Sequence, residues 1–449
     1  MESIRSLLGQ LVRWAPAALL LAFGGVVLTS SAQTYGPPPV RPQAPSSPQP
    51  PSQPPSQAQP QPQGQAQPNA FRPEILTPLK AAEELIRAGK FSDALVKIQE
   101  ADTVPNRTPT ENLAIERMRG IAASGAGDIP AATRSFEIVL AAGGLTPAEQ
   151  TKMVEVLAQL HFQAKDYPKA ASWASRYVSE GGPNPEIRGL MIQAQLQTGD
   201  CANASRELRA LVDAEAKSGG TPTQERLQLL TNCYAKLGDD AGYAFALDKL
   251  LASYPKKEYW ADAIRRVENK ASFANHNALD VLRLRHATGT LDGTPYYATM
   301  TRLAMDAGLP AEAKRISDEG FASGALGTGA DADAQKRLRD TAAKQVVEDQ
   351  KQLPQSAKAA SAARDGNALV NVGFAYVSGG QFDTGIPMME QGIAKGGLRR
   401  PDEAKLHLGI AYLSAGRKAD AVRTFQGVGG ADGTAELARL WLIFAQRPS

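Results

Sequence analysis

The side chains that could carry out chemistry are few in this sequence and lie far apart. Its histidines are His161, His276, His286 and His407, and they have neither metal-ligand spacing nor a neighbouring nucleophile motif. The glycine-rich stretch 320–329 lacks the spacing and the lysine of a phosphate-binding loop. The sequence therefore predicts no catalytic residue, no metal site and no cofactor, and it indicates that the protein is not an enzyme.

The composition narrows the class of partner. The chain has 449 residues, and its 49 basic and 46 acidic side chains are mixed along the whole length to give a formal charge of +3. Because there is no dense basic block to neutralise a phosphate backbone, we expect no nucleic-acid partner. Aromatic residues make up only 6% of the chain, and β-branched residues are sparse, which favours helices over sheets.

The first 32 residues have the order of a secretory signal peptide. Arg5 and Arg13 precede an apolar run over residues 15–29, and the small residues 30–32 end it, with Gln33 as the expected new N-terminus. An uncleaved inner-membrane anchor is the alternative, although the run is short for a membrane span. Both alternatives carry the rest of the chain across the membrane, so we expect a bacterial periplasmic protein whose only membrane contact would be such an anchor.

Residues 33–70 consist almost entirely of proline, glutamine, serine and alanine. Proline fixes φ and removes amide donors, so this segment predicts an extended, solvated linker rather than a packed core. A docking site for a proline-recognising partner is the alternative function for the same composition. We expect the linker to hold the folded part away from the membrane.

Beyond Phe71 one pattern recurs along the chain. Each copy has a helix end at a glycine, a turn, and a new helix with an alanine five residues after that glycine. Copies stand at residues 88–94, 307–313 and 415–421. This recurrence predicts a chain of helix–turn–helix units rather than a set of unrelated domains.

The last copy belongs to the clearest unit. Leu408 and Gly409 precede Tyr412 on its first helix, and Ala421 and Phe425 lie on its second. This unit resembles the tetratricopeptide repeat, whose signature sets a large residue beside a small one, then an aromatic, then an alanine and an aromatic on the second helix. The resemblance implies an all-α fold, a right-handed superhelix (α-solenoid) of about ten such repeats.

The signature gives repeat starts near 75, 113, 151, 185, 224, 294, 366 and 402, with degenerate units near 258 and 328. We expect N-terminal repeats at 71–255, degenerate helical repeats at 256–365, and C-terminal repeats with a capping helix at 366–449. The polar run 331–364 predicts one or two helices with an interruption at Pro354.

Small residues would let the two helices of a unit approach closely, because a helix pair cannot bury both apolar faces alone. Gly120 and Gly409 are examples, and Phe136 and Phe425 would fill the gap to the next pair.

The repeat frame also places the two cysteines. Cys201 would open the second helix of the unit at 185, and Cys233 would sit late in the first helix of the next unit. Antiparallel helices put both positions at the same end of the stack. A Cys201–Cys233 disulfide, formed in an oxidising compartment, and two separate buried thiols are the two alternatives.

In this family the first helices of successive units line a concave groove that faces a bound peptide. Carrying the family's offsets over predicts partner contacts at Gln159, Phe162, Gln163, Gln193, Gln197, Gln228, Asn232 and Lys236. Amide side chains offer both donors and acceptors, so they could satisfy an extended backbone without demanding a sequence. A solvated polar face is the alternative.

The same offsets give an apolar strip in the last two units, made of Val370, Phe374, Val377, Leu406, Ile410 and Leu413. The strip is either a site for an apolar anchor of a partner or plain core. The segment 436–446 is too apolar for a solvated capping helix, since it contains Leu440 and Phe444. It either packs back into the groove or contacts another chain, which would make the protein an oligomer.

We conclude from the sequence that the protein is a non-catalytic periplasmic scaffold or adaptor. It would bind other envelope proteins or peptides in its concave groove and organise the cell envelope. The alternative is a structural component of an export or surface-assembly complex that contacts an outer-membrane protein.

Overall fold

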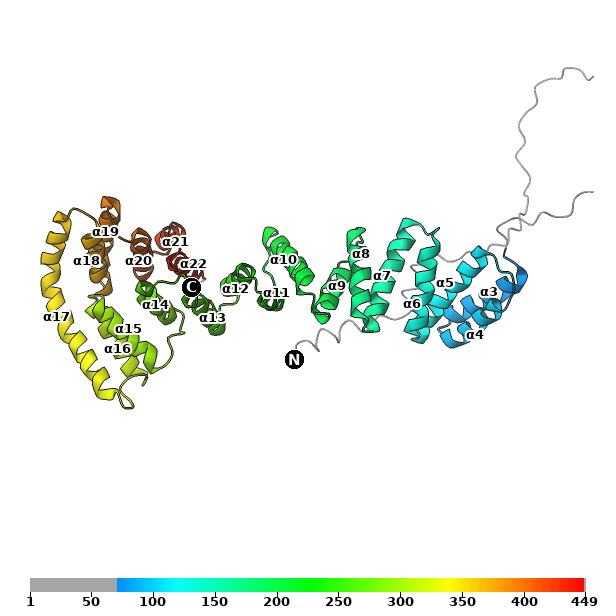
Figure 1. Ribbon diagram of the computed structural model, residues 1–449, viewed down its shortest axis with the longest axis horizontal. Coiled ribbons are helices and arrows are strands. Elements are labelled where there is room, and N and C mark those ends of the chain that lie inside the picture. The colour runs from blue at the N-terminus through cyan, green and yellow to red at the C-terminus, as the bar shows by residue number, and fades with distance from the viewer. Residues whose placement is uncertain (1–70, 448–449) are drawn as a thin grey trace, which may run out of the picture. The chain divides into compact units, whose positions relative to one another are not determined.

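The computed structural model describes residues 71–447. The predicted signal peptide at 1–32 and the predicted linker at 33–70 lie outside these residues. Within them, all regular structure is helical, with twenty α-helices, one short 3-10 helix and no strand. The all-α repeat fold is therefore confirmed (Figure 1).

The contacts between helices divide the chain into two compact units, 1–204 and 205–449, with the boundary inside α10. In the first unit, consecutive helices pack as antiparallel neighbours, α3 with α4, α5 with α6 and α7 with α8. Its helices are α3 (Pro73–Arg87), α4 (Phe91–Asp102), α5 (Pro109–Ala126), α6 (Ile129–Ala142), α7 (Pro147–Gln163), α8 (Tyr167–Ser179), α9 (Pro185–Gln197) and the start of α10 (Cys201–Lys217).

The second unit continues the pairing and then closes on itself. Its helices are α11 (Gln224–Leu237), α12 (Asp240–Ser253), α13 (Lys257–Glu268), the 3-10 helix η1 (Asn275–Asn277), α14 (Ala278–Ala287), α15 (Thr294–Asp306), α16 (Pro310–Ala322), α17 (Ala332–Ala362), α18 (Asn367–Ser378), α19 (Phe382–Lys395), α20 (Pro401–Ser414), α21 (Lys418–Gln426) and α22 (Thr434–Gln446). Helix α22 packs against α20 and α21, and also against α12, α13 and α14 (Figure 1). The helices from α13 to α22 therefore form a closed ring.

Each of the ten repeat starts expected from the sequence falls within four residues of the start of a helix. The unit expected near 328 differs from the others, because α17 is a single helix that runs through Pro354. The predicted interruption at this proline is wrong. A proline inside a helix costs about 3 kcal/mol. Packing of α17 against α15, α16 and α18, with Leu353 buried beside the proline, offsets that cost.

Close approach of paired helices depends on glycine. The ring of Phe136 lies against Gly120, and that of Phe425 lies against Gly409, so a Cβ at either glycine would meet the ring at 2.5 Å or less. The predicted partnership of small and aromatic residues is confirmed. Helices α18 and α19 approach even more closely, because a Cβ at Gly373 would lie 2.7 Å from the carbonyl oxygen of Gly385.

Two helices of the first unit, α5 and α7, begin with capping boxes. The Thr108 hydroxyl accepts from the Glu111 N–H at 3.2 Å, and the Glu111 carboxylate accepts from the Thr108 N–H at 2.8 Å. Thr146 and Glu149 form the same box at the start of α7. Each glutamate also binds an arginine two helices earlier. Glu111 on α5 binds Arg72 at the N-cap of α3, and Glu149 on α7 binds Arg117 on α5. One carboxylate thus both caps a helix and ties it to the preceding part of the chain.

We expect Gly120→Ala to destabilise the first unit by about 1–3 kcal/mol, because Phe136 is fully buried and cannot move away from the new methyl group. Gly189→Ala is the matched control. It is the same substitution inside α9, at a position with open space around the Cβ. Replacing an exposed helical glycine should stabilise by about 0.5–1 kcal/mol. Urea unfolding followed by circular dichroism measures both, and equal effects would contradict the packing argument.

We also expect acid to destabilise the first unit. The side-chain hydrogen bonds from Arg72 lower the pKa of Glu111 to about 2, and the Thr146 N–H and then Arg117 lower that of Glu149 to about 2. Both folded-state values lie below the ordinary 4.5. The unfolded chain therefore binds more protons, and the free energy of unfolding falls as the pH drops from 4.5 towards 2.

Urea unfolding at a series of pH values across this window measures the slope of stability against pH. The double variant Glu111→Gln, Glu149→Gln has no carboxylate to protonate at either box, so its slope should be shallower than that of the wild type. An unchanged slope would show that other carboxylates cause the acid sensitivity.

Candidate functional site

The second unit has a cavity of about 460 Å³ that is partly open to solvent and has the size of a small-molecule or anchor site. Most of its wall is apolar and comes from α15, α18, α19, α20 and α22. The large apolar side chains of the wall are Met300, Phe374, Val377, Phe382, Ile410, Leu413, Trp441 and Phe444. The charged part of the wall comes from α14 and α16, namely Arg283, His286, Glu312 and Arg315.

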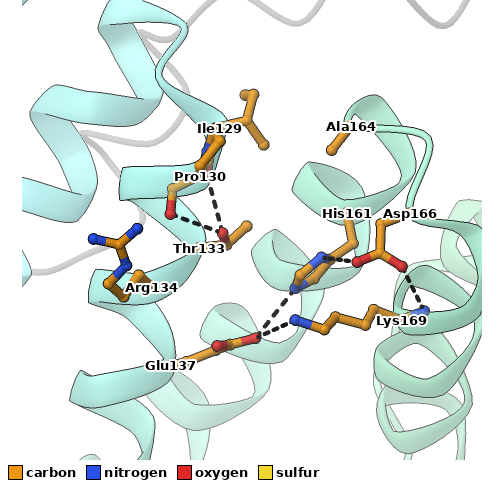
Figure 2. A pocket seen from close by; sticks show the side chains of 9 residues that line it. All are labelled: Ile129, Pro130, Thr133, Arg134, Glu137, His161, Ala164, Asp166 and Lys169. Carbon is orange, nitrogen blue, oxygen red and sulfur yellow. Dashed lines mark hydrogen bonds and ion pairs between the residues drawn. The ribbon is translucent and has the colours of Figure 1, made fainter.

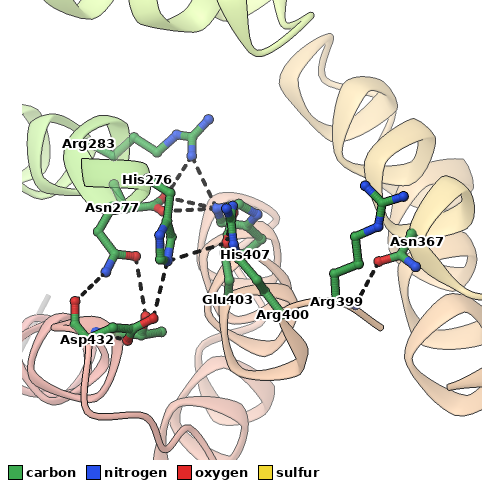
Figure 3. Close-up of polar contacts among 11 residues, drawn as sticks. His276, Asn277, Arg283, Asn367, Arg399, Arg400, Glu403, His407 and Asp432 are labelled. Atoms are coloured by element: carbon green, nitrogen blue, oxygen red, sulfur yellow. Dashed lines mark hydrogen bonds and ion pairs between the residues drawn. The ribbon is translucent and has the colours of Figure 1, made fainter. Parts of the chain in front are cut away.

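A buried charge cluster forms one side of this cavity. Arg283 on α14 donates to both oxygens of Glu312 on α16, at 2.8 Å and 2.6 Å, and to Asp280 one turn earlier at 2.6 Å. Asp280 also accepts from Nε2 of His407 on α20 at 3.0 Å (Figure 3). The guanidinium and both carboxylates are almost completely buried. The cluster therefore joins three helices through polar groups that are mostly shielded from water.

Burial alone would raise the pKa of Asp280, but His407 and Arg283 hold it well below its usual range. Burial would likewise raise the pKa of Glu312, but Arg283 and, to a smaller extent, Arg315 hold it low. Burial would lower the pKa of Arg283, but the two carboxylates have the larger effect and raise it. All three groups are consequently charged at neutral pH, which is the state that makes these hydrogen bonds strongest.

An aromatic contact extends the cluster into the apolar wall. The imidazole of His407 stacks on the ring of Phe374 with the centroids 4.6 Å apart and the planes 8° apart. Arg283 lies over the same ring, 4.8 Å from its centroid. Because a carboxylate only accepts, the Nε2 of His407 that faces Asp280 carries the proton. The histidine is thereby held in one orientation between the charges and the cavity.

A second set of polar contacts closes the ring beside this cluster (Figure 3). The carbonyl oxygen of Asp432, just before α22, accepts from the Ala274 N–H and from Asn277 Nδ2, both at 2.9 Å. His276 Nε2 lies 3.2 Å from the Asp432 carboxylate and 3.8 Å from that of Glu403. These contacts fasten η1 to α20 and to the loop before α22.

The C-terminal segment settles against its own chain. Leu437, Leu440 and Trp441 of α22 are buried, and Phe444 makes an edge contact with Trp260 on α13, with ring centroids 6.1 Å apart. Of the two alternatives for residues 436–446, the structure has the one in which the segment packs back into the groove.

The apolar strip predicted for the last two units is divided between core and cavity. Val370 and Leu406 are buried and do not line the cavity. The other four members line it, Phe374 and Val377 from α18 and Ile410 and Leu413 from α20. Helix α22 covers the strip from the opposite side and contributes Trp441 and Phe444 to the same cavity.

In the first unit, the predicted groove residues form a repeating row on α7 and α9. Gln163 and Gln197 are exposed, and each stands two residues before a position with positive φ, Lys165 and Gly199. Gln159 and Gln193 lie one turn earlier on the same faces and are half-buried. Phe162 is also half-buried and makes an edge contact with Tyr167, with centroids 5.5 Å apart.

The remaining predicted groove residues lie on α11 in the second unit. Gln228, Asn232 and Lys236 are all exposed, and Lys236 again stands two residues before a positive-φ position, Gly238. Gln228 is engaged, since its Nε2 donates to the Tyr259 hydroxyl at 2.8 Å.

A smaller cavity of about 300 Å³ lies between α6, α7 and α8 in the first unit (Figure 2). His161 is a buried histidine in its wall, with Nε2 at 3.3 Å from Glu137 and Nδ1 at 3.5 Å from Asp166. Lys169 lies 3.9 Å from the same Glu137 carboxylate. This arrangement is a local ion network that joins two neighbouring repeats.

Both cysteines are buried. Cys201 lies at the start of α10 in the first unit, and Cys233 lies inside α11 in the second unit. The Cys201–Cys233 disulfide and two separate buried thiols therefore stay the two predicted alternatives.

Sequence reasoning missed the charge cluster because its members come from three different repeats, and Asp280 and His407 are 127 positions apart in the chain. One local signal was present. Asp280, Arg283 and Arg285 interrupt a helix whose other residues are mostly apolar, and the residues from Leu279 to Arg285 are all buried. A charge at a core position of a short apolar helix predicts a buried partner elsewhere.

Two kinds of site are not found in the described part of the chain. Between residues 71 and 447, no group of three or more histidine, cysteine, aspartate or glutamate side chains could hold a metal ion. Among the helices of the same residues, none combines the length and the apolar character needed to cross a bilayer.

The family model of the tetratricopeptide repeat matches residues 117–185 and 373–434, one stretch in each unit. The two stretches together make up less than a third of the chain, and they support the family resemblance of these repeats. Repeats of this type generally act as non-catalytic scaffolds for protein–protein interaction. No curated protein is similar enough to this chain to count as a relative.

Solved structures of repeat proteins resemble the chain only distantly. TPR-like repeats of a putative kinesin light chain from Podospora anserina are 16% identical, over 42% of this chain and 96% of that one, with a TM-score of 0.27. Naa15/Naa10 bound to HypK-THB is 13% identical, over 78% of this chain and 62% of that one, with a TM-score of 0.27. Yeast Tom70 is 10% identical, over 83% of this chain and 95% of that one, with a TM-score of 0.23. At such scores the whole chains do not superpose, so the fold rests on the protein's own helices.

We expect Arg283→Met to destabilise the second unit by about 3–5 kcal/mol, because it leaves two carboxylates buried without their guanidinium. Arg302→Met is the control, since Arg302 is an exposed arginine on α15 and its loss should cost less than about 0.5 kcal/mol. Chemical denaturation measures both. A loss below about 1 kcal/mol for Arg283→Met would show that water reaches the cluster.

Proposed function

We propose that this protein is an exported scaffold that binds other proteins or peptides of the bacterial cell envelope. The feature that carries the proposal is the row of amide side chains on the first helices of successive repeats. Gln159 and Gln163 on α7 recur as Gln193 and Gln197 on α9, at the same distance from the turn that ends each helix. A row that repeats at this spacing suits an extended chain better than a compact small molecule.

The chemistry of the row supports a peptide ligand. Each amide offers two donors and one acceptor, and an extended peptide presents one donor and one acceptor per residue. Such a row holds a peptide backbone with little demand on its sequence. The outermost member of each pair, Gln163 or Gln197, is exposed and therefore accessible to a partner without any change in fold. The half-buried Phe162 adds an apolar contact beside the row.

The compartment is proposed from the N-terminal sequence. The basic, apolar and small-residue order of residues 1–32 is typical of a secretory signal peptide, and the proline-rich residues 33–70 suit a spacer between the membrane and the repeats. We therefore place the scaffold in the periplasm.

Photo-crosslinking in intact cells tests this function. A photo-reactive amino acid at position 163 or 197 should capture one or a few discrete proteins, because these positions lie in the amide row. The matched control is position 138, an exposed side chain on the second helix of a pair. The control should give no discrete product.

Equal products at positions 163, 197 and 138 would overturn the groove as a partner site. Capture of an outer-membrane complex alone would favour the structural, surface-assembly role over the adaptor role. N-terminal sequencing of the same purified protein tests export. An N-terminus at Gln33 is expected, an intact Met1 in a membrane fraction indicates the anchored form, and an intact Met1 in the cytoplasm would exclude the proposed compartment.

A further inference from the structure

The cavity inside the ring of the second unit has a wall that is not explained by packing alone. It measures about 460 Å³ and is partly open to solvent, although α22 has folded back over the groove and supplies large side chains to it. The contact that closes the ring therefore leaves a space that is accessible to a ligand.

Some polar groups of the wall have partners within the protein, and one does not. Glu312 is satisfied by both of its hydrogen bonds from Arg283, and His286 pairs with Glu319 at 2.5 Å. Arg315 is exposed and makes no hydrogen bond or ion pair with any residue in the range 71–447. The wall thus presents one guanidinium that is not neutralised by a direct partner.

A second donor in the wall lacks an acceptor. The indole of Trp441 is only 4% exposed and lines the cavity. Its Nε1–H is buried and has no hydrogen-bond partner among the described residues. The ring therefore meets the cavity with its carbon atoms, which suits an apolar part of a ligand.

The remaining wall is formed by side chains such as Phe374, Ile410, Leu413 and Phe444. A polypeptide passing along it would bury a donor and an acceptor at every residue, and these side chains could satisfy neither. An acyl chain has no polar groups along its length, and each methylene that it buries stabilises the complex. The wall therefore suits a hydrocarbon chain whose polar atoms are gathered at one end.

We propose that the cavity of the second unit binds a single-chain amphiphile, an acyl or alkyl chain with an anionic head group. The chain lies along the wall of Phe374, Ile410 and Phe444, and the head group accepts from Arg315. Carboxylate and phosphate heads share this chemistry. The site is separate from the amide row of the first unit, so this inference does not rest on the proposed scaffold function.

Tryptophan fluorescence of the full chain tests the proposal, with dodecanoate brominated on its chain as the probe and concentrations kept below micelle formation. Bromine quenches an indole on contact, so we expect saturable quenching with one site per chain. Trp441→Phe should lose most of this quenching, whereas Trp173→Phe, which alters an indole in the first unit, should retain it. Quenching that does not saturate would overturn the site.

The head group is tested by charge. Arg315→Gln should weaken dodecanoate binding about tenfold, because a hydrogen bond to a charged group is lost. Arg302→Gln, an exposed arginine of the same unit outside the cavity, should leave it unchanged. Dodecylammonium, which has the same chain and a cationic head, should bind at least tenfold more weakly. Equal binding of the anion and the cation, or no effect of Arg315→Gln, would overturn the assignment of the head group.

Two further comparisons complete the test. Leu413→Trp fills the cavity with an apolar side chain and should abolish binding while the circular dichroism spectrum is retained. Undiminished binding to a folded Leu413→Trp variant would place the ligand elsewhere. The binding of dodecyl phosphate is then compared with that of dodecanoate. The head group of the natural ligand should bind more tightly, so this comparison distinguishes a lipid phosphate from a fatty acid as the source of the anion.

Discussion

A pair of helices in this protein leaves an apolar face that only a neighbouring helix can cover, and the arrangement of both units depends on this constraint. Within the first unit the next pair supplies the cover, as where the ring of Phe136 lies on Gly120 and packs with Met153 and Leu157 of α7. The second unit solves the problem differently. Helix α22 returns to α12, α13 and α14, so the last apolar face is covered by helices far back in the chain. The helix pairs of the second unit therefore form a closed ring instead of an open stack.

Closure also explains where the buried charges lie. An ion pair taken out of water adds little net stability, but breaking it leaves an uncompensated charge and costs much more. Asp280, Arg283 and Glu312 can all be satisfied only when α14 and α16 face each other in one register, with His407 brought in from α20. Apolar contacts would tolerate small slips between helices, whereas this cluster would not. We infer that the cluster selects one way of closing the ring.

The local part of this fold could be predicted from the sequence, because it rests on residues a few positions apart. Glycines followed by turns gave helix ends, and the pairing of Gly409 with Phe425 follows from the spacing within one repeat. Pro354 misled the prediction, because its local penalty is outweighed by packing of α17 with three other helices, which no local pattern contains. The sequence likewise left two alternatives for residues 436–446, packing back into the groove or contact with another chain. Only the positions of α12, α13 and α14 decide between them.

The two candidate sites, the amide row and the cavity, also differ in how far local sequence patterns predict them. The amide row follows the repeat, so each member could be placed by counting from the turn that ends its helix, as Gln163 and Gln197 illustrate.

The cavity results from closure of the ring, so its residues could not be placed by counting along the repeats. Phe374 and Ile410 were recognisable as an apolar strip, but Arg315 and Trp441 enter the same wall from helices that the repeat frame does not relate to them. A surface made by repetition presents one chemistry many times, which suits an extended partner. A cavity made by closure brings different chemistries together once, and an amphiphile with two unlike ends matches that arrangement.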